Sequence, residues 1–153
     1  MDLIQDFIHN RVLITAAAGW ACAQITKAVI FCIVNKRFEP ERLFGDGGMP
    51  SAHSATVTAM ALTVGFTSGF SSPVFGLALM FALIVMHDAM GVRLETGKQA
   101  KLLNEMMEVF DRMSEVDLSL EDRLKEFVGH TPLQVVCGAC VGLLVAALGA
   151  LLF

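Results

Sequence analysis

Four apolar stretches, each long enough to cross a lipid bilayer, restrict the fold of this chain more than any other feature of its sequence. They are residues 12–34, 53–72, 73–92 and 131–153. The middle two meet at Gly-Phe-Ser-Ser-Pro, residues 69–73, a composition typical of a tight turn between antiparallel helices. Because a helix needs about 20 apolar residues to cross the hydrocarbon core, the pattern predicts four transmembrane helices.

The composition agrees with a membrane protein and excludes an ordinary soluble domain. Hydrophobic residues make up 55% of the 153 residues, and the mean hydropathy is +0.63, which is too apolar for a typical soluble chain. We therefore expect one all-α integral membrane domain over 1–153, with about four transmembrane helices and amphipathic helices between the third and the fourth. The acidic Asp2 and Asp6 stand where a secretory signal carries positive charge, so the first helix is expected to be retained.

The cysteines give no sign of a redox or metal site. Cys22, Cys32, Cys137 and Cys140 all fall inside predicted transmembrane helices, where small residues help helices to approach one another. The Cys-x-x-Cys spacing at 137 and 140 lacks the βαβ context of a redox motif. We expect neither disulfides nor a bound metal.

Four crossings place all the polar motifs on one side of the membrane. The segments 35–52 and 93–130 then face the same compartment, and they contain every lysine and arginine except Arg11 and Lys27. By the positive-inside rule this side is the cytoplasmic face of a bacterial inner membrane, or the equivalent face of an organelle membrane. Both termini are expected on the opposite side.

The polar segment 93–130 is expected to contain two helices. Residues 98–113 have apolar side chains at helical spacing with charged residues between them, the pattern of an amphipathic helix. A short second helix is expected to begin at Ser119, where Asp122 completes a capping box, and to end at Gly129. These helices are expected to lie on the membrane face or over a site. A linker hairpin without a catalytic role is the alternative.

A first motif, Gly-Gly-Met-Pro-Ser-Ala-His-Ser-Ala at 47–55, predicts a helix start that can bind an anion. Gly47 and Gly48 give the backbone freedom, and Ser51 is a favourable N-cap. The first amides of a helix have no internal partner and lie at the positive end of its dipole, so a phosphate near His53 would meet preformed donors. The alternative is a plain helix start with a surface histidine.

A second motif, Gly-His-Thr-Pro-Leu-Gln at 129–134, predicts a helix that begins with an oriented histidine. Thr131 as N-cap and Pro132 at the first helical position are typical of a helix start. A spacing of four places four residues on one face of this helix: His130, Gln134, Gly138 and Gly142. A histidine oriented by a side-chain acceptor is typical of a nucleophile or general base, although a capped helix-end histidine has the same sequence pattern.

Charged residues within or beside the apolar helices form a third group. Asp88 lies at the end of an apolar helix, where an unpaired charge is costly, so it is a candidate functional residue. The alternative is that it forms an ion pair with Arg93 or Lys98. Lys27 lies deep in the first span, and Gln24 shares its helical face. Lys27 therefore either extends to the surface or serves a polar interior, and the position of Gln24 favours the polar interior.

Together these motifs resemble a known family. The segments GGMPSAHSA (47–55), HDAMGVRLETGKQAKLLNE (87–105) and VGHTPLQVVCGACVG (128–142), with Gln24 and Lys27 upstream, are similar to the short divergent branch of the type 2 phosphatidic acid phosphatase and vanadium haloperoxidase superfamily. The resemblance implies phosphoester hydrolysis through a phosphohistidine without a metal or other cofactor, and inhibition by vanadate as a phosphate mimic.

The resemblance also implies roles for individual residues. His130 would attack phosphorus, His53 would protonate the leaving group, and Gln134 would stand where the family has the acid that orients the nucleophile. The family pattern also has two arginines, one after the lysine of its first motif and one before the nucleophile. This sequence has Val34 and Leu124 at those two positions, so other residues would have to hold the phosphate. The expected site is therefore completed by a larger set: Asp88 as charge partner, Lys27, Ser51, Arg93, Lys98 and Gly48 as phosphate ligands, and Gln24 and Asn104 in support.

Three functional classes remain open. The first is a membrane phosphatase that acts on a lipid phosphomonoester such as phosphatidylglycerophosphate or phosphatidic acid, which a cytoplasmic-facing site would meet at the inner leaflet. The second is a catalytically weak or silent scaffold or regulator with the same fold, because Gln134 is not an acid. The third is a small ion or proton carrier that uses His53, Asp88 and His130. We expect membrane lipids as partners and no nucleic acid, and a homo-oligomer stays open.

Overall fold

The computed structural model describes residues 3–37, 47–114, 124 and 129–152. Every regular element in these residues is a helix. The helices are α1 (Leu3–Ile8), α2 (Arg11–Asn35), α3 (Ala52–Ser68), α4 (Pro73–Met90), α5 (Val92–Ser114) and α6 (Pro132–Leu152). The prediction of an all-α fold is confirmed.

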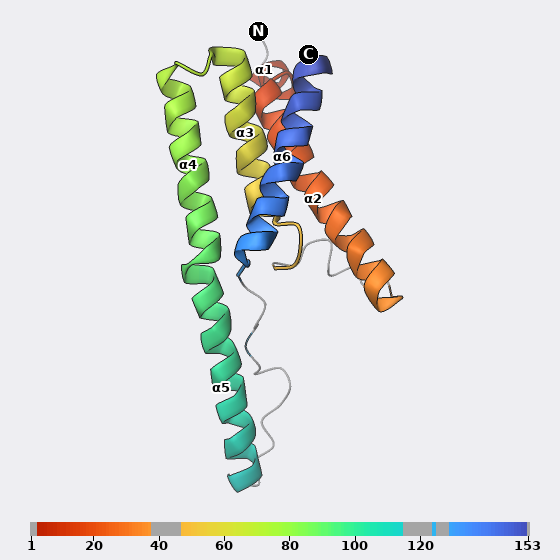
Figure 1. Cartoon of the computed structure of the whole chain (residues 1–153), viewed down its shortest axis with the longest axis vertical. Coiled ribbons are helices and arrows are strands. Elements are labelled where there is room, and N and C mark those ends of the chain that lie inside the picture. The colour runs from red at the N-terminus through yellow and green to blue at the C-terminus, as the bar shows by residue number, and fades with distance from the viewer. Residues whose placement is uncertain (1–2, 38–46, 115–123, 125–128, 153) are drawn as a thin grey trace.

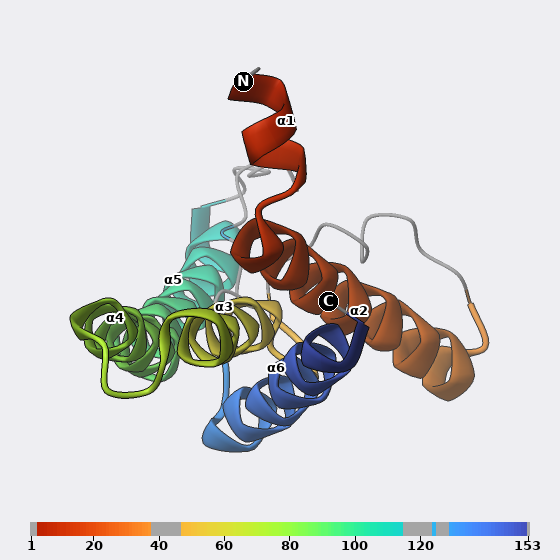
Figure 2. The same cartoon turned by 90° about the horizontal axis from the view of Figure 1, so that it is seen from above.

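Helix α3 lies at the centre of the bundle. It packs against α2, α4 and α6, and α2 also contacts α6 (Figure 2). Its buried residues are mostly small, such as Ala55 and Ala59, which are fully buried, so the neighbouring helices can approach closely. The N-terminus, the C-terminus and the α3–α4 turn lie at one end of the bundle, while α3 and α6 begin at the other end (Figure 1).

The lengths of the helices fit an integral membrane protein. Within the described residues, three helical stretches are long and apolar enough to cross a membrane: Arg11–Asn35, Pro73–Phe110 and Pro132–Leu152. Helix α3, with 17 residues, is at the short limit for a crossing helix, and it ends at Ser68 rather than at residue 72. Gly69 ends it with a φ of 88°. The outward faces carry large exposed apolar side chains such as Leu77, Ile84 and Leu151, as expected for contact with lipid.

Helix α6 meets α3 with almost no space between the two backbones. A Cβ atom added at Gly138 would overlap the carbonyl oxygen of Ser51, and one added at Gly142 would overlap that of Ala55. The predicted role of this glycine stripe in close helix packing is confirmed. Cys22, Cys32, Cys137 and Cys140 are free thiols.

Helix α5 extends α4 beyond the bundle (Figure 1). Gly91 separates them, and its N–H donates to the carbonyls of both His87 and Asp88. The amphipathic helix predicted at 98–113 exists but begins earlier, at Val92. Its apolar residues Leu102, Met106, Phe110 and Met113 are exposed, so most of α5 does not cover the bundle. The second helix, predicted from Ser119 to Gly129, falls largely outside the described residues.

Candidate active site

Two histidines lie close together where α3 and α6 begin. His53 is the second residue of α3, and His130 precedes the first turn of α6. Their ring centroids are 5.7 Å apart, and the ring planes are inclined by 62°. His130 is 2% exposed, and its backbone N–H donates to the carbonyl of Ala89 in α4 at 3.0 Å. Contacts from three helices therefore fix the position of the pair.

Ser51 attaches the start of α3 to α6. Its hydroxyl accepts from the N–H of Ser54 at 3.3 Å, which is the predicted N-cap. Its backbone N–H donates to the carbonyl of Gln134 at 3.0 Å, and its side chain is fully buried. Ser51 thus positions His53 in the structure, while its direct contact with a phosphate stays a prediction.

Both histidines line a cavity of about 430 Å³, a size typical of small-ligand sites. Its polar lining comes from Gln24, Lys27, Gly47, His53, Thr56 and His130, and its apolar lining from Trp20, Ala52, Val57, Phe81 and Val85. The lining thus offers a cation, two imidazoles and an amide together with apolar side chains. The cavity combines what an anionic headgroup and an attached hydrocarbon each require.

Helix α2 contributes the cation and the amide of this cavity. Lys27 and Gln24 are each only 7% exposed, so the predicted polar interior is confirmed and Lys27 does not extend to the surface. The backbone of Gly48, at a φ of 81°, lies against the aliphatic part of the Lys27 side chain, which holds the loop before α3 over this lysine. The phosphate-binding role of both residues stays a prediction.

Gln134 orients His130 and caps α6 with the same oxygen. Its Oε1 accepts from the N–H of Thr131 at 3.0 Å and lies 3.3 Å from Nδ1 of His130. The N–H of Gln134 in turn donates to Oγ1 of Thr131 at 3.4 Å, which completes a capping box. Because the Thr131 N–H can only donate, the atom that faces it must be the amide oxygen. Nδ1 of His130 therefore carries a proton, and the lone pair of the neutral ring is on Nε2.

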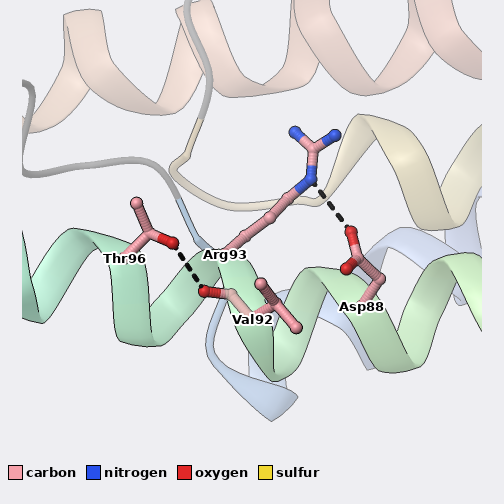
Figure 3. A network of polar contacts seen from close by, with 4 residues as sticks. All are labelled: Asp88, Val92, Arg93 and Thr96. Atoms are coloured by element: carbon pink, nitrogen blue, oxygen red, sulfur yellow. Dashed lines mark hydrogen bonds and ion pairs between the residues drawn. The ribbon is translucent and has the colours of Figure 1, made fainter.

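The other predicted charged residues pair with one another. Nε of Arg93 lies 3.1 Å from Oδ2 of Asp88 at the α4–α5 junction, and both side chains are half-exposed (Figure 3). Nζ of Lys98 lies 2.6 Å from Oε1 of Glu95 on the surface of α5. None of the four lines the histidine cavity. Their roles as phosphate ligands or charge partner stay predictions, and the positive charge in the cavity wall comes from Lys27.

A second cavity, of about 350 Å³, lies beside Gln134. It is lined by Gly48, Leu94, Gly97, Lys98, Lys101, Gly129, Thr131 and Gln134.

Asn104 lines neither cavity: its side chain exchanges two hydrogen bonds with the backbone of Leu124, at 2.9 and 3.0 Å. It therefore acts in the structure by holding the chain at Leu124 against α5. The described residues contain no group of three His, Cys, Asp or Glu side chains that could hold a metal ion.

Several residues of the site were not predicted. The apolar lining residues Phe81 and Val85 lie in α4, which is apolar on every face over residues 73–86, so hydrophobic spacing could not single them out. Another apolar lining residue, Trp20, lies in α2. One signal was present: Trp20, Gln24 and Lys27 follow an i, i+4, i+7 spacing and so share a face of α2. The capping box between Thr131 and Gln134 was also readable from its Thr-x-x-Gln spacing.

Comparison with known proteins agrees with the resemblance seen in the motifs. The model of the divergent PAP2 family matches residues 8–145. The chain is also 33% identical to YuiD of Bacillus subtilis (strain 168), described as an uncharacterized membrane protein, over 97% of this chain and 99% of that protein. No solved structure matches. The chain therefore belongs to the divergent PAP2 family of membrane proteins.

Proposed function

We propose that this protein is a membrane phosphatase that hydrolyses a lipid phosphomonoester through a phosphohistidine at His130. The observation that carries the proposal is the shared cavity, in which His130 and His53 lie 5.7 Å apart between ring centroids with Lys27 in the same wall. A buried lysine beside two histidines suits an anionic ligand, and the apolar wall suits the lipid part of the substrate.

The first step transfers the phosphoryl group to the protein. Nε2 of His130, which carries the lone pair, attacks phosphorus. The nitrogen–phosphorus bond forms while the bond from phosphorus to the lipid oxygen breaks, and His53 gives its proton to that oxygen. Lys27 stabilises the negative charge on the remaining phosphoryl oxygens.

The second step releases inorganic phosphate. His53, now neutral, takes a proton from a water molecule, and the water oxygen attacks phosphorus. The nitrogen–phosphorus bond breaks, and His130 returns to its starting state. Neither step requires a cofactor, and vanadate, which resembles phosphate, is expected to inhibit by occupying the same site.

Gln134 sets the limit on this chemistry. Its amide oxygen holds the attacking tautomer of His130, but a neutral amide does not offset the positive charge that develops on the imidazole. In a serine protease triad, the carboxylate that orients the histidine also stabilises the imidazolium that forms, and Gln134 lacks that charge. We therefore expect slow turnover.

A catalytically silent regulator is the second candidate function. It is favoured by the capping box, because Gln134 would be retained for helix α6 even without catalysis. An ion or proton carrier is less well supported. Lys27 places positive charge beside the histidines, and Asp88 pairs with Arg93 instead of lining the cavity.

The substrate class follows from the side of the membrane that the site faces. We infer that the site faces the cytoplasm, because segments 35–52 and 93–130, which contain most of the basic residues, lead in the sequence to the starts of α3 and α6. Lipid phosphates made at the inner leaflet, such as phosphatidylglycerophosphate or phosphatidic acid, would then reach the cavity. Both termini would lie on the opposite side.

Phosphate release from purified protein in lipid micelles tests the proposed activity. His130→Ala should abolish release, and His53→Ala should lower it by about 10² to 10⁴, the usual contribution of a general acid. His87→Ala is the matched control, because His87 does not line the cavity, and it should keep wild-type activity. Equal release from all four proteins would refute the mechanism, and no release from the wild type on any lipid phosphate would favour the regulator.

Gln134→Glu should raise turnover at least about tenfold, because a carboxylate at this position stabilises the imidazolium of His130. Glutamate also serves as the third residue of a capping box, so the variant should fold like the wild type. Gln134→Met, which removes both hydrogen bonds, should lower turnover and the melting temperature together. Unchanged or lower turnover in a well-folded Gln134→Glu variant would contradict the role given to this residue.

Cysteine labelling in intact cells tests the orientation. In a variant without the four native cysteines, Met49→Cys reports on the site end of the bundle and Ser71→Cys on the opposite turn. A membrane-impermeant maleimide should label Ser71→Cys in intact cells and Met49→Cys only after permeabilisation. The reverse pattern would place the site outside and remove the argument for inner-leaflet substrates.

A further inference from the structure

Gln24 carries a buried hydrogen-bond acceptor that the proposed chemistry does not use. The residue lines the histidine cavity and is only 7% exposed. Among the described residues, none donates a hydrogen bond to its Oε1 atom, which is itself buried. An unsatisfied carbonyl oxygen in an apolar bundle is costly, so an acceptor placed in a ligand cavity points to a donor on the ligand.

The packing of α2 brings this acceptor to the cavity beside the first turn of α3. Ala23, the neighbour of Gln24, packs against Ala52 and Ala55 in the first turn of α3. Gln24, Ala52 and His53 all line the cavity. If His53 protonates the departing oxygen, the alcohol part of the substrate lies beside His53, in the cavity that Gln24 also lines.

The donor that Gln24 requires is not supplied by the phosphate group. The second ionisation of a phosphomonoester has a pKa of about 6, so above pH 7.5 nearly all of the substrate is a dianion without a P–OH group. Lys27, one helical turn from Gln24, suits the dianion. A hydroxyl on the alcohol is therefore the remaining donor of suitable size.

We propose that Gln24 selects a phosphomonoester whose alcohol carries a free hydroxyl on the carbon next to the phosphate-bearing carbon. This inference rests on the proposed phosphatase activity and narrows its substrate class. Phosphatidylglycerophosphate has such a hydroxyl, whereas phosphatidic acid has an ester in that position. A substrate without the hydroxyl leaves the buried oxygen of Gln24 unpaired, which is how enzymes discriminate strongly against analogues that lack one polar group.

A matched pair of substrates tests the selection. The first is 1-acylglycerol 3-phosphate, and the second is the 1-acylpropanediol 3-phosphate that differs only by lacking the middle hydroxyl. At pH 8 the wild type should have a kcat/KM at least about tenfold higher for the hydroxylated substrate. Gln24→Met keeps the length of the side chain without the acceptor, and it should reduce this ratio to near one, mainly by losing activity on the hydroxylated substrate.

Two controls separate this selection from a structural effect. Gln99→Met changes an exposed glutamine of α5 and should leave the ratio unchanged. In the wild type, kcat/KM should likewise be higher for phosphatidylglycerophosphate than for phosphatidic acid. In Gln24→Met this difference should be lost. A wild-type ratio near one, or an equal loss on both members of the matched pair in Gln24→Met, would overturn the selection while leaving the phosphatase proposal standing. Absence of hydrolysis of every substrate would overturn both.

Discussion

The backbone contact between α3 and α6 determines the geometry of the site. Gly138 and Gly142 let α6 lie directly on the carbonyl oxygens of Ser51 and Ala55, and the Ser51 N–H donates to Gln134. Within a membrane, lipid tails are as apolar as side chains, so close packing of small residues and hydrogen bonds between helices are the main forces that join them. A side chain at either glycine would separate α6 from α3 and move His130 away from His53.

Gln134 links this packing to the chemistry. Its backbone carbonyl oxygen accepts a hydrogen bond from the N–H of Ser51, the N-cap of α3. Its side-chain oxygen accepts from the N–H of Thr131 and lies within hydrogen-bond distance of Nδ1 of His130. The residue thus fixes the helix start, the loop and the tautomer of the histidine at once. An amide performs these structural tasks as well as an acid does, and it differs only in the charge that it offers to an imidazolium. In both candidate functions, the slow phosphatase and the silent regulator, Gln134 orients His130 but does not offset the charge of its imidazolium.

Sequence patterns predicted the helices well and the site in part. Long apolar runs and capping residues located α2 and α6 to within a residue or two, and polar residues on one face of an apolar helix placed Gln24 and Lys27 inside. Arg93 and Lys98 were predicted at the phosphate, but each forms an ion pair with an acid near it in sequence. Spacing cannot decide between a local pair and a distant ligand. Phe81 and Val85 could not be predicted as lining residues, because tertiary packing alone separates a cavity wall from a lipid-facing surface. Trp20 could have been predicted, because it shares a helical face with Gln24 and Lys27.

The central claim is that His130 becomes phosphorylated during turnover. Rapid acid-free quenching of the purified protein with a lipid phosphate carrying ³²P in its monoester, followed by peptide mapping, measures this directly. The account predicts an alkali-stable, acid-labile phosphoryl group on His130 that is absent in His130→Ala and accumulates in His53→Ala when attack by water is slowed. Hydrolysis without any label on His130, or label that persists in His130→Ala, would contradict it.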